Sequence, residues 1–159
     1  MYLQVQAEYF FNAFEVLKES NQLLIERLSS GAPSTEKAFG TRPAMGVEIV
    51  CLAFSVELYI KDLHYAITHE APRGHNILEL FEKLPEEIRR KIFTFHSVAN
   101  YGWTFSQFEK EMLAISDGFE KWRYAHEVTA VRYNIYFALV LIEAIKAIAG
   151  SLRGMGGQV

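Results

Sequence analysis

Residues 44–68 of the 159-residue chain read AMGVEIVCLAFSVELYIKDLHYAIT, and this stretch decides the fold class. Its apolar side chains recur every three or four residues, which is the spacing of one helical face. They are Met45, Ile49, Leu52, Val56, Tyr59, Leu63 and Ala66. The flanks of that face are also apolar, and a helix that is apolar on most sides packs in the middle of a bundle. The stretch predicts a central helix from Ala44 to about Thr68.

Glu57 and Lys61 are a charged pair inside this apolar helix. They stand four residues apart with the acid first, the favourable order for a helical ion pair. On an exposed face such a pair contributes little to stability. When buried it is costly unless it is fully hydrogen-bonded, and it is then more often retained for a site. Both side chains are therefore candidate ligand-binding residues.

Upstream, residues 2–29 carry a second helical stripe. Its members are Leu3, Ala7, Phe10, Phe14, Leu17, Leu24 and Leu28, with Asn21 as one polar member. The segment that follows is rich in serine, glycine and proline, so residues 30–42 are predicted to form a loop. Pro43 suits the first turn of the central helix, because its missing N–H would be unpaired there anyway.

Two shorter helices are predicted downstream of the central one. Asn76 is placed to cap the first, which runs through Leu84. Pro85 opens the second, and acidic residues in its first turn suit the helix dipole. This second helix is expected to end near Ser97.

The C-terminal third contributes two longer helices. Thr104 and Gln107 match the capping-box pattern that starts one of them. The other is expected from about Glu127 to Ser151, and the glycine-rich residues 152–159 are predicted to be a flexible tail. No strand alternation or fixed repeat occurs. The sequence predicts one all-α domain over residues 1–159, an up-down bundle of four to five helices.

Composition narrows the functional classes. A net charge of -3 and a pI near 6.0 argue against a duplex-DNA binder, which needs a broad basic surface. One cysteine, Cys51, can form neither an internal disulfide nor a thiolate zinc site, which fits a cytoplasmic protein. The uncharged run from Tyr133 to Ile142 is shorter than the roughly 20 residues that span a bilayer, so no membrane association is expected.

Residues 123–127 gather polar groups where two predicted helices meet. Arg123 can hold a phosphate by two parallel hydrogen bonds, Tyr124 can stack on a base, and His126 can move a proton near neutral pH. The alternative is structural: Arg123 pairs with a carboxylate such as Glu57 or Glu127, and Tyr124 packs in the core. No metal site, cofactor motif or nucleophile motif is found in the chain.

Three segments in order carry a family resemblance. They are AFSVELYIK (residues 53–61), GHNILELFEKLP (74–85) and FEKWRY (119–124). Together they resemble the HEPN superfamily (higher eukaryotes and prokaryotes nucleotide-binding) over roughly residues 45–145. The resemblance implies a four- to five-helix bundle that forms a homodimer. It also implies a setting such as toxin–antitoxin or phage-defence systems, where some members are metal-independent RNases and others only bind nucleotides or partner proteins.

Active members have about four to six residues between an arginine and a histidine near the start of the last helix. Here only two residues separate Arg123 from His126. The resemblance therefore favours a non-catalytic module for protein interaction or for RNA or nucleotide binding. The alternative is an RNase with Arg123 and His126 as catalytic residues at a dimer groove. Arg90 and His96 have a similar spacing but lie in another helix, and are expected to be a solvated arginine and a partly buried histidine.

The expected ligand site lies in a cleft between the central and the last helix. It is formed by Glu57, Lys61, His75, Arg123 and Tyr124. Aromatic residues make up 14% of the chain, more than one bundle of this size needs. The excess on the last helix, namely Tyr133, Tyr136 and Phe137, is predicted to form the face that contacts a second subunit.

Overall fold

The computed structural model describes residues 2–30, 46–116 and 133–155. Its central element is helix α2 (Val47–Thr68), half of whose side chains are buried. Gly46 precedes the helix with a φ of 92°, a left-handed conformation that glycine adopts without strain. The prediction of an apolar helix at the centre of the molecule is confirmed, while residues 44 and 45 lie outside the described part.

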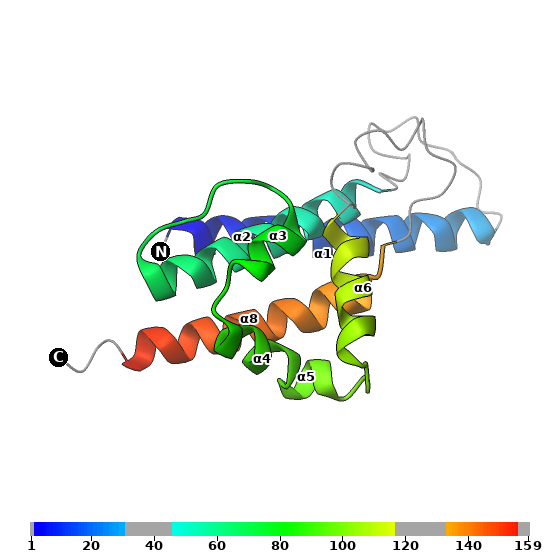
Figure 1. Ribbon diagram of the computed structural model, residues 1–159. Helices are drawn as coiled ribbons and strands as arrows, with labels where there is room; N and C mark the ends of the chain where they lie inside the picture. Colours follow the sequence, from blue (N-terminus) through cyan, green and yellow to red (C-terminus); the bar gives the residue numbers. More distant parts are fainter. Residues whose placement is uncertain (1, 31–45, 117–132, 156–159) are drawn as a thin grey trace.

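Helix α1 (Tyr2–Ser29) matches its predicted bounds and runs antiparallel to α2 (Figure 1). The rings of Phe10 and Phe54 stack between the two helices with centroids 5.0 Å apart. The buried Asn21 donates a hydrogen bond of 3.1 Å to Glu48 of α2. The polar interruption in the α1 stripe is thus satisfied by a carboxylate near the start of α2, as a buried amide requires.

Helix α8 (Ile135–Met155) packs against α2 and runs in the same direction (Figure 1). It was expected to begin near Glu127, but Tyr133 and Asn134 are not helical. Asn134 caps the helix by accepting the backbone N–H of Phe137 at 3.1 Å, and its amide donates to Glu111 at 2.9 Å. The predicted start was wrong because the apolar periodicity hid this capping residue.

The C-terminal end of α8 also corrects the predicted tail. Residues 152–155 are helical and not part of a flexible segment. Arg153 donates to the buried carboxylate of Asp62 and, at 3.1 Å, to Gln4. These contacts fix the end of α8 to both α1 and α2. Residues 156–159 lie outside the described part.

Between residues 69 and 116 the structure describes four shorter helices: α3 (Ile77–Glu82), α4 (Glu86–Phe93), α5 (His96–Ala99) and α6 (Phe105–Ser116). Asn76 caps α3 through the backbone N–H of Glu79, and Thr104 and Gln107 form the predicted capping box. The helix expected to continue to Ser97 is instead divided, because Phe95 has an extended backbone between α4 and α5.

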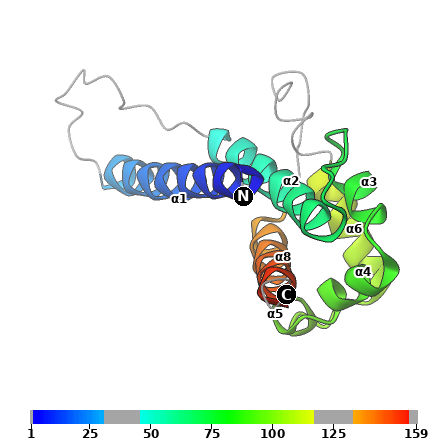
Figure 2. The same cartoon turned by 90° about the vertical axis from the view of Figure 1, so that its left-hand side faces the viewer.

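The described residues form helices joined by turns and loops, with no strand among them, so the all-α class is confirmed. Figures 1 and 2 show that the helices form two groups. The long helices α1, α2 and α8 form one group, whereas α3, α4 and α6 lie on the other side of α2 and α8. In Figure 1, α6 runs across α8 and not beside it, so the up-down order does not extend to α6.

The aromatic face predicted on α8 is not a single exposed surface. Phe137 is fully buried, with its ring centroid 5.2 Å from those of both Trp103 and Phe108. Tyr133 has a buried hydroxyl without a hydrogen-bond partner, and burial raises its pKa. Only Tyr136 is largely exposed. The prediction that these three residues share a subunit face is therefore wrong for Phe137, because α6 and Trp103 cover it.

Among the described residues, one helical segment, Ile135–Gly154, is long and apolar enough to cross a bilayer by length and composition alone. Its charged side chains are engaged with the rest of the bundle: Glu143 with His96, Lys146 with Glu8 and Arg153 with Asp62. One face of the helix is buried against α2, as in the core helix of a bundle. The absence of membrane association remains a prediction.

Candidate functional site

Glu57 is the one acidic residue in the middle third of α2, and it is buried. Its side chain is only 4% exposed. A carboxylate removed from water in this way is strongly unfavourable unless charged or hydrogen-bonding groups compensate it. The contacts made by Glu57 therefore decide what this part of the molecule can do.

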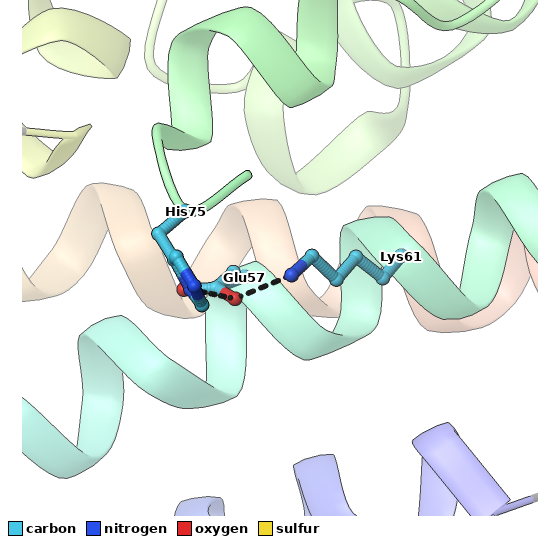
Figure 3. Close-up of polar contacts among 3 residues, drawn as sticks. All are labelled: Glu57, Lys61 and His75. Atoms are coloured by element: carbon cyan, nitrogen blue, oxygen red, sulfur yellow. Dashed lines mark hydrogen bonds and ion pairs between the residues drawn. The ribbon is translucent and has the colours of Figure 1, made fainter. Parts of the chain in front are cut away.

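Two cationic or proton-carrying groups meet the same oxygen of Glu57. Lys61 Nζ lies 2.8 Å from Glu57 Oε1, and His75 Nδ1 lies 3.0 Å from that atom. Figure 3 shows the lysine and the imidazole approaching the carboxylate from different sides. The structure thus brings together three of the five predicted ligand-binding residues. We call Glu57, Lys61 and His75 the Glu57 cluster.

The connection between α2 and α3 places His75 over Glu57. Helix α2 ends at His69, which has a φ of 60° and donates its backbone N–H to Tyr65. The chain then turns through Gly74 at a φ of 104°, a conformation that favours glycine. His75 directly precedes Asn76, the cap of α3, so the start of a helix fixes its backbone position.

A buried histidine attaches α3 to α2 close to the cluster. His64 Nε2 lies 2.8 Å from the backbone carbonyl oxygen of Leu80. A carbonyl oxygen only accepts, so this nitrogen carries the proton and donates. His64 is therefore a structural donor between the two helices. Within the described residues, no group of three or more metal-ligating side chains occurs.

Ser116 is a neighbouring residue that the sequence interpretation missed. Its hydroxyl donates to Asn76 Oδ1 at 2.7 Å and accepts the backbone N–H of Leu78 at 3.2 Å. Ser116 thereby fixes the described end of α6 next to the residue that follows His75. The sequence shows only a serine beside the apolar stripe of α6. The spacing of residues within α6 does not indicate that this serine contacts α3.

The remaining predicted site residues, Arg123, Tyr124 and His126, lie outside the described part of the chain. They belong to residues 117–132, which begin directly after Ser116. The proposed catalytic roles of Arg123 and His126, and the alternative pairing of Arg123 with Glu57, therefore stay predictions. The described partners of the Glu57 carboxylate are Lys61 and His75.

Arg90 and His96 do not form a joint site. Arg90 pairs with Glu86 at 2.7 Å on the exposed face of α4, as expected of a solvated arginine. His96 Nε2 lies 3.2 Å from Glu143 of α8. His96 was expected to be partly buried, but it is exposed because its short helix α5 ends the packed layer with only one face covered.

The Glu57 cluster presents an oriented imidazole to solvent. The His75 side chain is 69% exposed, whereas its carboxylate partner is buried. Because Nδ1 faces Glu57, the other ring nitrogen, Nε2, is the one available to an outside ligand. Lys61 balances the charge of Glu57, so a protonated His75 adds one net positive charge. In that protonated form Nε2 also carries a hydrogen, and the arrangement suits an anionic oxygen.

The described residues also line two shallow hollows, both away from the cluster. One, of about 280 Å³, lies between α1 and Leu139 of α8. The other, of about 240 Å³, lies between α4 and Phe105 of α6. Between α2 and α8, where a cleft was expected, the two helices are packed directly against each other.

No protein-family model, curated protein or solved structure matches the chain.

Proposed function

We propose that the protein is a HEPN-like, dimeric, non-catalytic helical module that binds the phosphate groups of RNA or a nucleotide at the Glu57 cluster. One observation carries the proposal: a single buried carboxylate oxygen holds both Lys61 and a solvent-exposed imidazole. Burial of Glu57 is costly, and the exposed position of His75 is not needed to fill the core. The chemistry that such a fixed, outward imidazole serves is recognition of an anion.

The charge of the chain limits the ligand to a short one. A net charge of -3 does not support binding along many phosphates of a duplex. A nucleotide or a short single strand needs only one or two fixed donors, with further affinity from stacking on aromatic rings. The predicted roles of Arg123 and Tyr124 fit the same ligand, as an additional phosphate donor and a stacking surface.

Fluorescence anisotropy with a labelled single-stranded RNA and with a labelled nucleotide tests the proposal. We expect His75→Ala to weaken binding about tenfold, the loss of one charge-assisted hydrogen bond. His96→Ala is the matched control, since its imidazole is equally exposed and also pairs with a carboxylate. We expect this variant to bind within about twofold of the wild type.

Three outcomes would contradict the proposal. If the wild type binds neither ligand, the Glu57 cluster has only a structural role. The remaining function is then that of a module that binds a partner protein and no RNA. If the same samples show RNA cleavage that Arg123→Ala abolishes, the protein is the RNase of the alternative prediction. Equal loss of binding in His75→Ala and His96→Ala would indicate nonspecific charge effects.

A further inference from the structure

Helix α1 has an apolar surface that no other described element covers. Six large apolar side chains of α1 are exposed, by 42% to 76% of their surface: Tyr2, Val5, Tyr9, Val16, Leu23 and Ile25. The opposite face of the helix contributes Ala7 and Phe14 to the core. We call Tyr2, Val5, Tyr9, Val16 and Leu23 the α1 stripe.

The spacing of the α1 stripe makes it one continuous surface. Tyr2, Tyr9, Val16 and Leu23 are separated by seven residues each, and a straight helix drifts only about 20° over that interval. At 1.5 Å per residue the row is about 32 Å long. Single exposed apolar residues are ordinary, but an aligned row of this length is typical of an interface.

The sequence of the α1 stripe fits a second copy of itself in antiparallel orientation. A two-fold axis between residues 12 and 13 places Tyr9 opposite Val16 of the partner subunit. The same axis places Tyr2 opposite Leu23 of the partner subunit. A large ring then faces a smaller aliphatic side chain at each level, which allows close packing across an interface that is the same on both chains.

Charge favours the antiparallel over the parallel orientation. Glu19 lies on the same side of α1 as the stripe and is exposed. A parallel pair would place Glu19 against Glu19 of the partner subunit, and like charges at such a position are destabilising. The antiparallel pair separates these two carboxylates by about 20 Å along the helices, well beyond the roughly 8 Å screening length of physiological salt.

The exposed apolar area of the α1 stripe is large enough to form the centre of a subunit interface. The two tyrosines alone expose about 300 Å² per chain, from their exposed fractions and the usual area of a tyrosine. The aliphatic members of the stripe add to this. Standard interfaces bury about 800 Å² per partner, with an apolar centre inside a polar rim. The polar residues beside the stripe on α1 supply that rim.

We propose that two copies of the chain form a symmetric homodimer through antiparallel packing of their α1 stripes. The inference rests on the dimer named in the proposed function and moves its interface from the last helix to the first. In Figure 2, α1 and α3 lie on opposite sides of α2. The interface therefore leaves the Glu57 cluster of each subunit open to solvent.

Light scattering after size-exclusion chromatography tests the interface. We expect the wild type to have twice the 18.2 kDa mass of the chain, and Tyr9→Glu/Val16→Glu to be a monomer. Because both positions are exposed, circular dichroism should show unchanged helix content. The milder Tyr9→Ser/Val16→Ser variant should dissociate at protein concentrations at least tenfold higher than the wild type.

Tyr136→Glu and Leu113→Glu are the matched controls, since both residues are large, apolar and exposed on other helices. We expect both to remain dimers. A monomeric wild type overturns the dimer itself. A dimer that dissociates with Tyr136→Glu but not with the stripe variants overturns only the α1 interface. RNA binding measured separately on the monomeric variant tests the proposed ligand site without reference to the interface.

Cross-linking tests the orientation. In a Cys51→Ala background, Asn12→Cys lies beside the two-fold axis and should form a disulfide-linked dimer under mild oxidation. Leu23→Cys should not, because the two Cα atoms would be about 32 Å apart and a disulfide requires less than about 7 Å. Cross-linking at Leu23→Cys would indicate parallel packing, and no cross-link at either position would overturn the interface.

Discussion

The described part of the chain contains two histidine–carboxylate pairs whose imidazoles are equally exposed but whose carboxylates are not. Both His75 and His96 expose 69% of their side chains. Glu57, the partner of His75, is 4% exposed, whereas Glu143, the partner of His96, is 55% exposed. Distance alone does not separate the pairs, since the atoms are 3.0 Å and 3.2 Å apart.

The two pairs differ in the free energy that each carboxylate would lose if its contact with the imidazole were broken. Glu143 exchanges its contact with His96 for water at little cost, so the pair is an ordinary surface contact. Glu57 cannot replace its contact with His75 by water in this way, because its side chain is buried and also pairs with Lys61. An imidazole that is hydrogen-bonded to a buried carboxylate therefore has a defined orientation. This fixed orientation distinguishes a candidate site from a surface ion pair.

Removing each carboxylate should give the largest contrast. We expect Glu57→Ala to lower the free energy of unfolding by about 3 kcal/mol, because Lys61 stays largely buried without its partner. We expect Glu143→Ala to change it by less than about 0.5 kcal/mol. Urea denaturation followed by circular dichroism measures both values. Equal effects would remove the distinction between the pairs.

Replacing both buried charges together separates stability from binding. In Glu57→Leu/Lys61→Met, apolar side chains of similar size take the place of the ion pair, and we expect a loss of only about 1 kcal/mol. RNA or nucleotide binding should nevertheless fall to the level of His75→Ala, because the orienting carboxylate is gone. Denaturation and anisotropy on the same preparation test this. Unchanged binding would make Glu57 irrelevant to the ligand.

Double-mutant cycles measure the two contacts directly. We expect a coupling energy of about 1 kcal/mol between His75 and Glu57, using His75→Ala and Glu57→Gln. The coupling between His96 and Glu143 should be about 0.3 kcal/mol and should vanish at high salt, where exposed charges are screened. A salt-sensitive coupling for the His75 pair would indicate that the pair is effectively in solvent.

The smallest effect concerns the position of a proton. Glu57 contacts Nδ1 of His75, whereas Glu143 contacts Nε2 of His96. The neutral rings should therefore carry the proton on Nδ1 in His75 and on Nε2 in His96. Long-range nitrogen–proton NMR spectra at high pH distinguish these tautomers. A ring of His75 protonated on Nε2 would contradict its orientation by Glu57.

Local signals made part of the fold and the site predictable. The caps at Asn76 and Thr104, and the pairing of Glu57 with Lys61, each depend on residues three or four apart, and the structure confirms all of them. The bounds of α1 and the burial of α2 follow from apolar periodicity. Such features need no knowledge of the tertiary arrangement.

The features that sequence did not reveal depend on distant residues. His75 reaches Glu57 across 18 positions, and Arg153 reaches Asp62 across 91. The burial of Phe137 depends on the placement of α6, which no local pattern specifies. A repeat of seven on the outer side of α1 was hidden because the inner stripe satisfies the same helical period.

The packing of α8 beside α2 has a consequence for synthesis of the chain on the ribosome. Helix α2 ends at Thr68 and α8 begins at Ile135, so 67 residues must be added before the second can start to cover the first. At about 5 to 20 residues per second this takes roughly 3 to 13 s. During that interval the nascent chain displays the side of α2 on which Tyr59 later contacts Lys146 and Asp62 later pairs with Arg153. An uncovered apolar helix of this kind is a target for chaperones.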